Sequence, residues 1–172
     1  YTFCGTCAFA PVCLPTGYDK SALAELHCII EHVGPFPADH VVFRQNEPLT
    51  AIYAVRAGMV KTAMLDDEGQ EKVLGFHLPG ELVGLNAIYP GRYPCDAICL
   101  DAVTLCRFSF GAIATLASRI PGIQEQLLRL LSKDIGALSL LAGDYSADQR
   151  MAAFLVRLSQ RYAERGYSAT RF

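Results

Sequence analysis

The sequence predicts an α+β fold that is mainly β: a β-roll or jelly roll with a short helix before it and a long helix after it. Apolar residues alternate in short segments throughout residues 33–110, and turns rich in Gly, Pro, Asn and Asp separate these segments. Short strands spaced about 8–12 residues apart are typical of sandwiches and jelly rolls. A helical spacing of apolar residues precedes this region and returns after it. Strands and helices do not alternate along the chain, which argues against a parallel doubly wound sheet.

Each expected element has its own local signal. The apolar spacing over residues 20–31 predicts a helix, with Ser21 capping its first turn. Pro121 suits the first turn of a second helix, which we expect to run over residues 121–143. The expected strands are residues 41–43, 51–55, 60–65, 72–76 and 103–110.

The composition narrows the classes of protein. Hydrophobic residues make up 52% of the 172 residues and charged residues 19%, which excludes a disordered chain. Fifteen Lys and Arg against seventeen Asp and Glu give a net charge of -2, so the chain is not a nucleic-acid binder by bulk charge. No apolar run approaches the roughly 18 residues of a membrane span, and no signal peptide opens the chain. We therefore expect a cytoplasmic protein without membrane contact.

Seven cysteines are the most informative feature. Their odd number in an ordinary globular composition argues against a secreted disulfide scaffold. Cys4, Cys7 and Cys13 lie in a Gly- and Pro-bearing segment, residues 1–17, that has no helical or strand period. In a reducing compartment, clustered cysteines of this kind indicate metal or redox ligands.

The spacing Cys4-x2-Cys7-x5-Cys13 lets three thiolates reach one centre, either zinc or an iron–sulfur cluster. The fourth ligand is open on spacing alone. Two of the candidates, Cys28 and Cys99, lie on apolar faces where we expect core packing. The candidates are His27, His32, Cys28, Cys95, Cys99 and Cys106.

Other chemistry is weakly represented. Residues 80–85, Gly-Glu-Leu-Val-Gly-Leu, resemble the phosphate-binding cassette of the cyclic-nucleotide-binding fold. That cassette continues into an Arg-Ser pair, whereas this sequence has Arg92-Tyr93-Pro94, and Pro94 removes a backbone donor. The four histidines form no H-x-H pair, and no hydrolase or P-loop motif occurs. We therefore expect a protein that is not an enzyme.

Helix 121–143 carries an apolar stripe stepping by three and four residues, as in a coiled coil. We expect it to form the seam of a homodimer; the alternative is packing on the chain's own β-domain. The Ser146/Gln149 pair then predicts a capping box for a further helix that ends at Gly166. The seam residues are Leu128, Leu131, Ile135 and Leu138.

Taken together, the cysteine loop, the β-roll with residues 75–84 (Gly-Phe-His-Leu-Pro-Gly-Glu-Leu-Val-Gly), the leucine-rich helix and residues 150–155 resemble the FNR branch of the CRP/FNR transcription regulators. The resemblance implies an oxygen-labile 4Fe-4S cluster on four cysteines. Cys4, Cys7 and Cys13 match the first three. The fourth matches Cys106, within Leu-Cys-Arg-Phe-Ser-Phe at residues 105–110, and Cys95 is the second choice.

The same resemblance implies a dimer that binds DNA and contacts RNA polymerase. The acidic turn at Asp66, Asp67 and Glu68 resembles the family's polymerase-contacting loop; the alternative is a solvated hairpin turn. A helix-turn-helix domain needs more residues than follow Gly166. We therefore expect this chain to sense and dimerise without recognising a DNA sequence, and the full-length regulator to bind a palindromic site.

These expectations divide the chain into a cluster loop (1–17), a β-roll sensory domain (18–120), a dimerisation helix (121–143) and the start of a DNA-binding domain (144–172). The predicted function is an oxygen-responsive, iron–sulfur sensory domain of a dimeric transcription regulator. The alternatives are a small-molecule effector module of the same cyclic-nucleotide-binding-like fold without a cluster, and a zinc-stabilised interaction domain.

Overall fold

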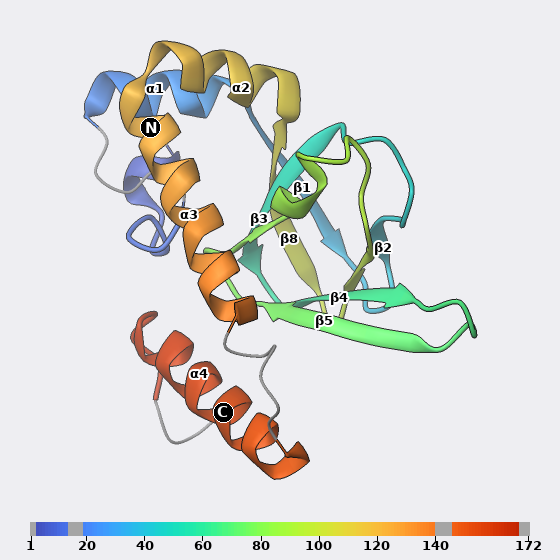
Figure 1. Cartoon of the computed structure of the whole chain (residues 1–172). Coiled ribbons are helices and arrows are strands. Elements are labelled where there is room, and N and C mark those ends of the chain that lie inside the picture. The colour runs from blue at the N-terminus through green and yellow to red at the C-terminus, as the bar shows by residue number, and fades with distance from the viewer. Residues whose placement is uncertain (1–2, 14–18, 140–145, 169–172) are drawn as a thin grey trace. The chain divides into compact units, whose positions relative to one another are not determined.

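The computed structural model describes residues 3–13, 19–139 and 146–168. It divides the chain into two compact units, Tyr1–Gln124 and Glu125–Phe172. Figure 1 shows the elements of each unit in chain order. The first unit contains the sheets and the described part of the cysteine loop.

The helices and strands have the following bounds. The helical elements are the 3-10 turns η1 (Phe3–Thr6) and η2 (Leu85–Ala87), and the α-helices α1 (Lys20–Cys28), α2 (Phe110–Arg119), α3 (Pro121–Ser139) and α4 (Ala147–Ala163). The strands are β1 (Ile30–Phe36), β2 (Val41–Phe43), β3 (Ala51–Ala57), β4 (Val60–Leu65), β5 (Glu71–His77), β6 (Leu82–Val83), β7 (Asp96–Cys99) and β8 (Val103–Ser109).

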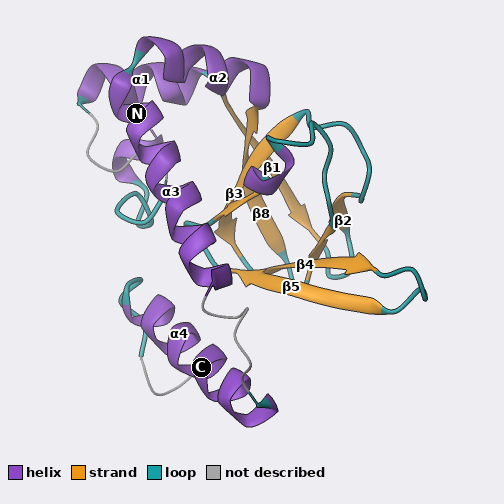
Figure 2. Cartoon of the chain, viewed as in Figure 1, coloured by secondary structure: helices purple, strands orange, loops and turns teal. Residues whose placement is uncertain are grey.

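The strands form two four-stranded antiparallel sheets, ordered β1-β8-β3-β6 and β2-β7-β4-β5 (Figure 2). This arrangement confirms the predicted β-roll. β8 lies between β1 and β3, so both of its edges are hydrogen-bonded. β4 and β5 form a long hairpin that ends in the acidic turn.

The core lies between the two sheets, where alternate residues of the strands face each other. Tyr93 is 2% exposed and stacks on Phe43 with ring centroids 3.8 Å apart. Its hydroxyl donates to the Ala51 carbonyl at 2.6 Å and accepts from the Ala51 N–H at 3.2 Å. These contacts tie the loop before β7 to β3 through the middle of the roll.

Two predicted boundaries at the first helix are wrong. Asp19, not Ser21, caps α1: its Oδ1 accepts from the Ala22 N–H at 2.7 Å. The helix also ends at Cys28, because Ile30 already pairs with Phe108 as the first residue of β1. Pairing with β8 therefore overrides the helical spacing at this point.

The sequence did not predict a separate helix α2. Phe110, expected to end the last strand, instead begins this helix. Ile120 between α2 and α3 has extended backbone angles, φ -118° and ψ 99°. A residue that precedes proline is biased towards such angles, so Pro121 explains why two helices form here rather than one.

The second unit contains most of α3, together with α4. The predicted capping box is confirmed, because Ser146 Oγ accepts from the Gln149 N–H and the Gln149 side chain accepts from the Ser146 N–H. α4 ends at Ala163, three residues before the predicted Gly166, which has φ +76° in the turn that follows. Residues 140–143, expected to end the dimerisation helix, lie outside the described residues. Across the described ranges, no helix is long and apolar enough to cross a bilayer.

Candidate functional site

The cysteine loop is a chain of tight turns that follows η1. The Ala10 N–H donates to the Cys7 carbonyl at 3.1 Å, and the Cys13 N–H donates to the Phe9 carbonyl at 3.0 Å. Cys4 and Cys13 are buried and Cys7 is partly buried. Within the described residues 3–13, the segment is therefore a hydrogen-bonded loop with its cysteines turned largely away from solvent.

Cys106 lies in the middle of β8, one of the two central strands of its sheet. Its neighbours across the sheet are His32 of β1 and Ala54 of β3. Because cross-strand partners point to the same face, His32 and Cys106 share one face of the sheet. Cys106 is partly buried there.

The structure brings Cys4, Cys7 and Cys106 into one neighbourhood. Burial raises the pKa of the Cys4 thiol to about 11, with added repulsion from Cys106 and then Cys7. Burial also raises the pKa of Cys106 to about 11; Arg56 opposes this rise and Cys7 adds to it. Cys4 and Cys7 of the loop and Cys106 of β8 therefore interact electrostatically, although they lie far apart in the sequence.

Basic side chains border this group of thiols. The Arg56 guanidinium Nη1 lies 3.5 Å from His32 Nδ1. Burial, then Arg56 and His27, lower the pKa of His32 below its ordinary value. A guanidinium favours a nearby thiolate over a thiol. Arg56 was not predicted as a site residue; the only signal for it in the sequence is a single basic residue directly after the apolar run 51–55.

The remaining cysteines lie elsewhere. Cys95 and Cys99 are 0% exposed and lie in the core, as expected for Cys99. The Cys95 sulfur is 3.8 Å from the Asn86 side-chain nitrogen. Cys28 is exposed, so the expectation that it packs in the core is wrong: the helix ends at this residue and the side chain is not covered.

The side chains around Cys106 determine which kind of metal centre this region could hold. In residues 3–13, 19–139 and 146–168, no three His, Cys, Asp or Glu side chains are arranged to hold a single metal ion. A 4Fe-4S cluster sets a different requirement, because its ligands are four cysteines. Interacting thiols from the loop and from β8, with a basic residue beside them, fit that donor chemistry.

The segment resembling a phosphate cassette forms the turn between β5 and β6 and the start of η2. Arg92 follows this segment and is the arginine that could bind a phosphate. Its Nη1 instead donates to the Asn46 carbonyl at 2.8 Å. The next residue, Tyr93, fills the middle of the roll. This geometry does not favour binding of a cyclic phosphate inside the roll.

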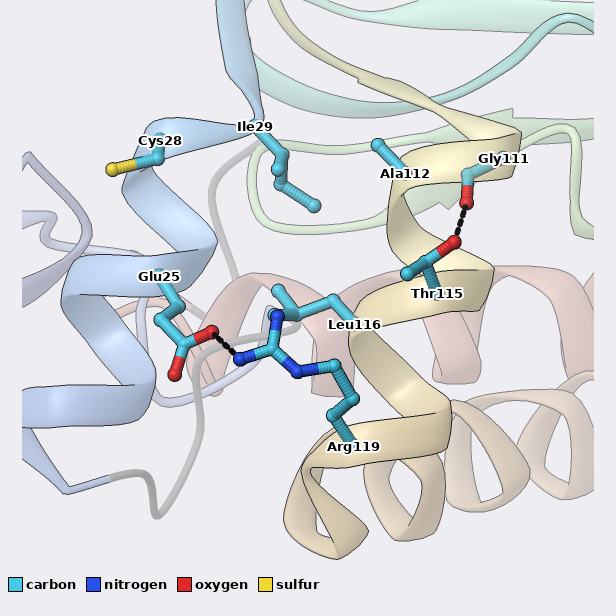
Figure 3. A pocket seen from close by; sticks show the side chains of 8 residues that line it. All are labelled: Glu25, Cys28, Ile29, Gly111, Ala112, Thr115, Leu116 and Arg119. Carbon is cyan, nitrogen blue, oxygen red and sulfur yellow. Dashed lines mark hydrogen bonds and ion pairs between the residues drawn. The ribbon is translucent and has the colours of Figure 1, made fainter.

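A pocket of about 450 Å³ lies between α1 and α2 (Figure 3). Its polar groups are paired with each other: Arg119 bonds Glu25 at 3.0 Å, and the Thr115 hydroxyl donates to the Gly111 carbonyl at 2.9 Å. The walls are otherwise mainly apolar, and Cys28 is among the lining residues. None of the loop cysteines lines it.

The acidic turn joins β4 to β5. Asp66 accepts from the backbone N–H groups of Gln70 at 2.9 Å and Glu68 at 3.0 Å, and it forms an ion pair with Lys72 at 3.2 Å. The hydrogen bond from Gln70 is the largest of the contacts that lower the pKa of Asp66, and those with Lys72 and Glu68 add to it. Asp66 therefore shapes the turn, while Asp67 and Glu68 are exposed.

The seam residues lie on α3. Leu128 is 60% exposed, Ile135 is 65% exposed and Leu131 is partly buried. The side chain of Leu138 lies outside the described residues. Two large apolar side chains are thus open to solvent two turns apart on one helix.

Comparison with known proteins gives consistent matches. The family model described as cyclic nucleotide-binding domain matches residues 34–119. The transcriptional activator protein anr of Pseudomonas aeruginosa is 37% identical over 98% of this chain and 70% of its own length. The anaerobic regulatory protein of Haemophilus influenzae is 36% identical over 98% of this chain and 67% of its own length.

Among solved structures, the sensor domain of the transcriptional regulator DNR from Pseudomonas aeruginosa matches with a TM-score of 0.63 and 25% identity. The match covers 74% of this chain and 90% of that domain. The matching relatives carry names of regulators rather than of enzymes, which confirms the prediction that the chain is not an enzyme.

Proposed function

We propose that this chain, which belongs to the CRP/FNR family of transcription regulators and contains a cyclic nucleotide-binding domain, is an oxygen-responsive sensory domain. The regulator of which it forms part is proposed to be cytoplasmic and dimeric, and to control gene expression according to the supply of oxygen. The names of anr and of the anaerobic regulatory protein support a role in such regulation.

We propose that Cys4, Cys7, Cys13 and Cys106 hold a 4Fe-4S cluster. The observation that carries the proposal is the interaction of the loop thiols Cys4 and Cys7 with Cys106 on β8. When bound, the cluster would supply an oxygen-labile redox centre. Arg56 would offset part of the negative charge of the thiolates, and burial of Cys4 and Cys13 would keep water from their sulfur atoms.

In the proposed response to oxygen, the presence of the cluster keeps the cysteine loop ordered. Thiolate ligation links metal binding to folding, because the ligands are held in place only while the centre is present. Loss of the cluster would remove the centre that ties the loop to β8. The element proposed to change its state in response is the helix of residues 121–143.

We propose that this helix forms the seam of a homodimer. Leu128 and Ile135 leave a large apolar surface open to solvent at heptad spacing, which suits burial against the same face of a second copy. Leu131 and Leu138 complete the proposed stripe. DNA binding by the full-length regulator belongs to the same proposal.

We also propose that the turn between β4 and β5 contacts RNA polymerase. The contacts of Asp66 within the turn support a division of roles. Asp66 holds the shape of the turn, and the exposed carboxylates of Asp67 and Glu68 meet the partner.

Anaerobic reconstitution with iron and sulfide tests the cluster. The unmodified chain should gain a broad visible absorption band that bleaches in air. Cys106→Ser should lose the band, whereas Cys95→Ser, a matched change at a buried core thiol, should keep it apart from a packing cost. A colourless protein with stoichiometric zinc would overturn the proposal. A band kept by Cys106→Ser and lost by Cys95→Ser would overturn the choice of ligand.

A further inference from the structure

Gly80 makes an unusually close contact with the cysteine loop. It is buried in the turn between β5 and β6, with φ +89°. A Cβ atom at this position would lie 2.5 Å from Val12 Cγ2 and 3.1 Å from Phe9 Cβ. Phe9 Cβ is fixed directly to the backbone, so rotation of a side chain does not remove that second contact. The loop therefore lies over a surface that only glycine provides.

The turn itself is fixed to the roll. The Gly80 N–H donates to the Val55 carbonyl at 2.8 Å, and the Val55 N–H donates to the Glu81 carbonyl at 3.0 Å. The Glu81 carboxylate accepts from the Leu78 N–H at 3.0 Å, which closes the turn. Val55 lies in β3, one residue after Ala54, the cross-strand partner of Cys106. The turn is thus a rigid connection between the underside of the loop and the strands that carry Cys106.

We propose that the turn Leu78, Pro79, Gly80 and Glu81 is a seat that holds the cysteine loop beside Cys106, and that Gly80 is the positioning residue of this seat. Gly80, the first residue of the segment that resembles a phosphate-binding cassette, therefore packs against the cysteine loop of the same chain. The inference rests on the proposed function for its significance, because the seat sets where the loop cysteines meet Cys106. The contact between the seat and the loop itself can be tested in the folded chain without a cluster.

The test uses the metal-free chain and measures how fast iodoacetamide labels each cysteine, resolved by peptide mass spectrometry. Gly80→Ala should speed labelling of Cys4 and Cys13 by about tenfold or more, because the added methyl group lifts the loop and raises its local opening. Gly91→Ala is the matched control: Gly91 also has a positive φ, +66°, but an added Cβ would meet nothing within 4 Å. Cys95, in the core, reports any global unfolding.

A second pair of variants approaches the contact from the loop. Val12→Ala removes the atom that lies 2.5 Å from the added methyl, so Gly80→Ala/Val12→Ala should label more slowly than Gly80→Ala. Val12→Asp places a charge over the buried turn without straining the backbone of Gly80. It should speed labelling of Cys4 and Cys13 as Gly80→Ala does.

Unchanged labelling in Val12→Asp would overturn the seat, even if Gly80→Ala does not fold. Equal effects of Gly80→Ala and Gly91→Ala would overturn it as well. The outcome is separate from that of the proposed function. A chain that never takes up iron and sulfide but shows these labelling changes has the seat and not the cluster. A Gly80→Ala chain with unchanged labelling and full cluster content has the cluster and not the seat.

Discussion

The raised pKa values of Cys4 and Cys106 make a quantitative prediction about thiol reactivity in the metal-free chain. Only the thiolate reacts with an alkylating agent. Burial is the main cause of the rise, from an ordinary 9.0 to about 11, at both cysteines. Labelling each cysteine with iodoacetamide over a range of pH values measures this rise, because the rate follows the thiolate fraction.

The magnitude follows from the two pKa values. At pH 8, about 10% of a thiol with pKa 9.0 is ionised, but only about 0.1% of a thiol with pKa 11. The reactive thiolate of Cys4 and Cys106 is therefore about 100-fold less populated than that of a cysteine in an unstructured peptide, and both should react more slowly than the peptide. Their rates should rise about tenfold for each pH unit and continue to rise above pH 9, where the peptide levels off. Steric cover slows them further and does not change this slope.

The matched variant is Arg56→Gln. Arg56 opposes the rise in the pKa of Cys106, so its removal should raise that pKa further and slow labelling of Cys106. The labelling rate of Cys4 should stay unchanged, since Arg56 is not among the groups that shift its pKa. The reasoning is refuted if Cys106 reacts at pH 8 as fast as the peptide, or if Arg56→Gln speeds its labelling while the chain remains folded.

Two further predictions concern the helix seam and the core. Leu131→Asp and Ile135→Asp should each yield monomers by light scattering, because a charge buried against its symmetry mate is strongly unfavourable; an unchanged dimer mass would leave these residues as intramolecular core. Tyr93→Phe should lower the free energy of unfolding in urea by about 1–3 kcal/mol, since both backbone groups of Ala51 lose a buried partner. Tyr89→Phe, at a fully exposed tyrosine, should leave the free energy unchanged, and equal effects of the two would contradict this account.

The sequence predicted β2, β3, β4 and β5 from their short apolar runs and the turns between them. Burial does not alternate in all of these strands: residues 51–55 of β3 are all buried, and residues 71–74 of β5 are all exposed. β1 was missed because its residues show little alternation: Pro35 and Gly34 interrupt it, and its pairing with β8 is a long-range property. α2 was missed because the break between it and α3 has a weak signal. Ile120 is an apolar residue that interrupts the helices only because it precedes Pro121.

The candidate site shows the same division. The spacing of Cys4, Cys7 and Cys13 identified the loop, but spacing left six candidates for the fourth ligand. Only the resemblance selected Cys106, and only the fold places it where it interacts with Cys4 and Cys7. Arg56 had no signal beyond its place at the end of a strand, because its role depends on which thiol lies beside it.

The position of Cys106 on a doubly paired strand has a mechanical consequence. A slip of one residue in β8 would turn every side chain of the strand to the opposite face, so this thiol cannot move without breaking both ladders. Of the two parts that meet at the site, one is immobile and the other is a string of turns. Under the proposed function, loss of the cluster would therefore displace the loop, while the paired strand would keep its register.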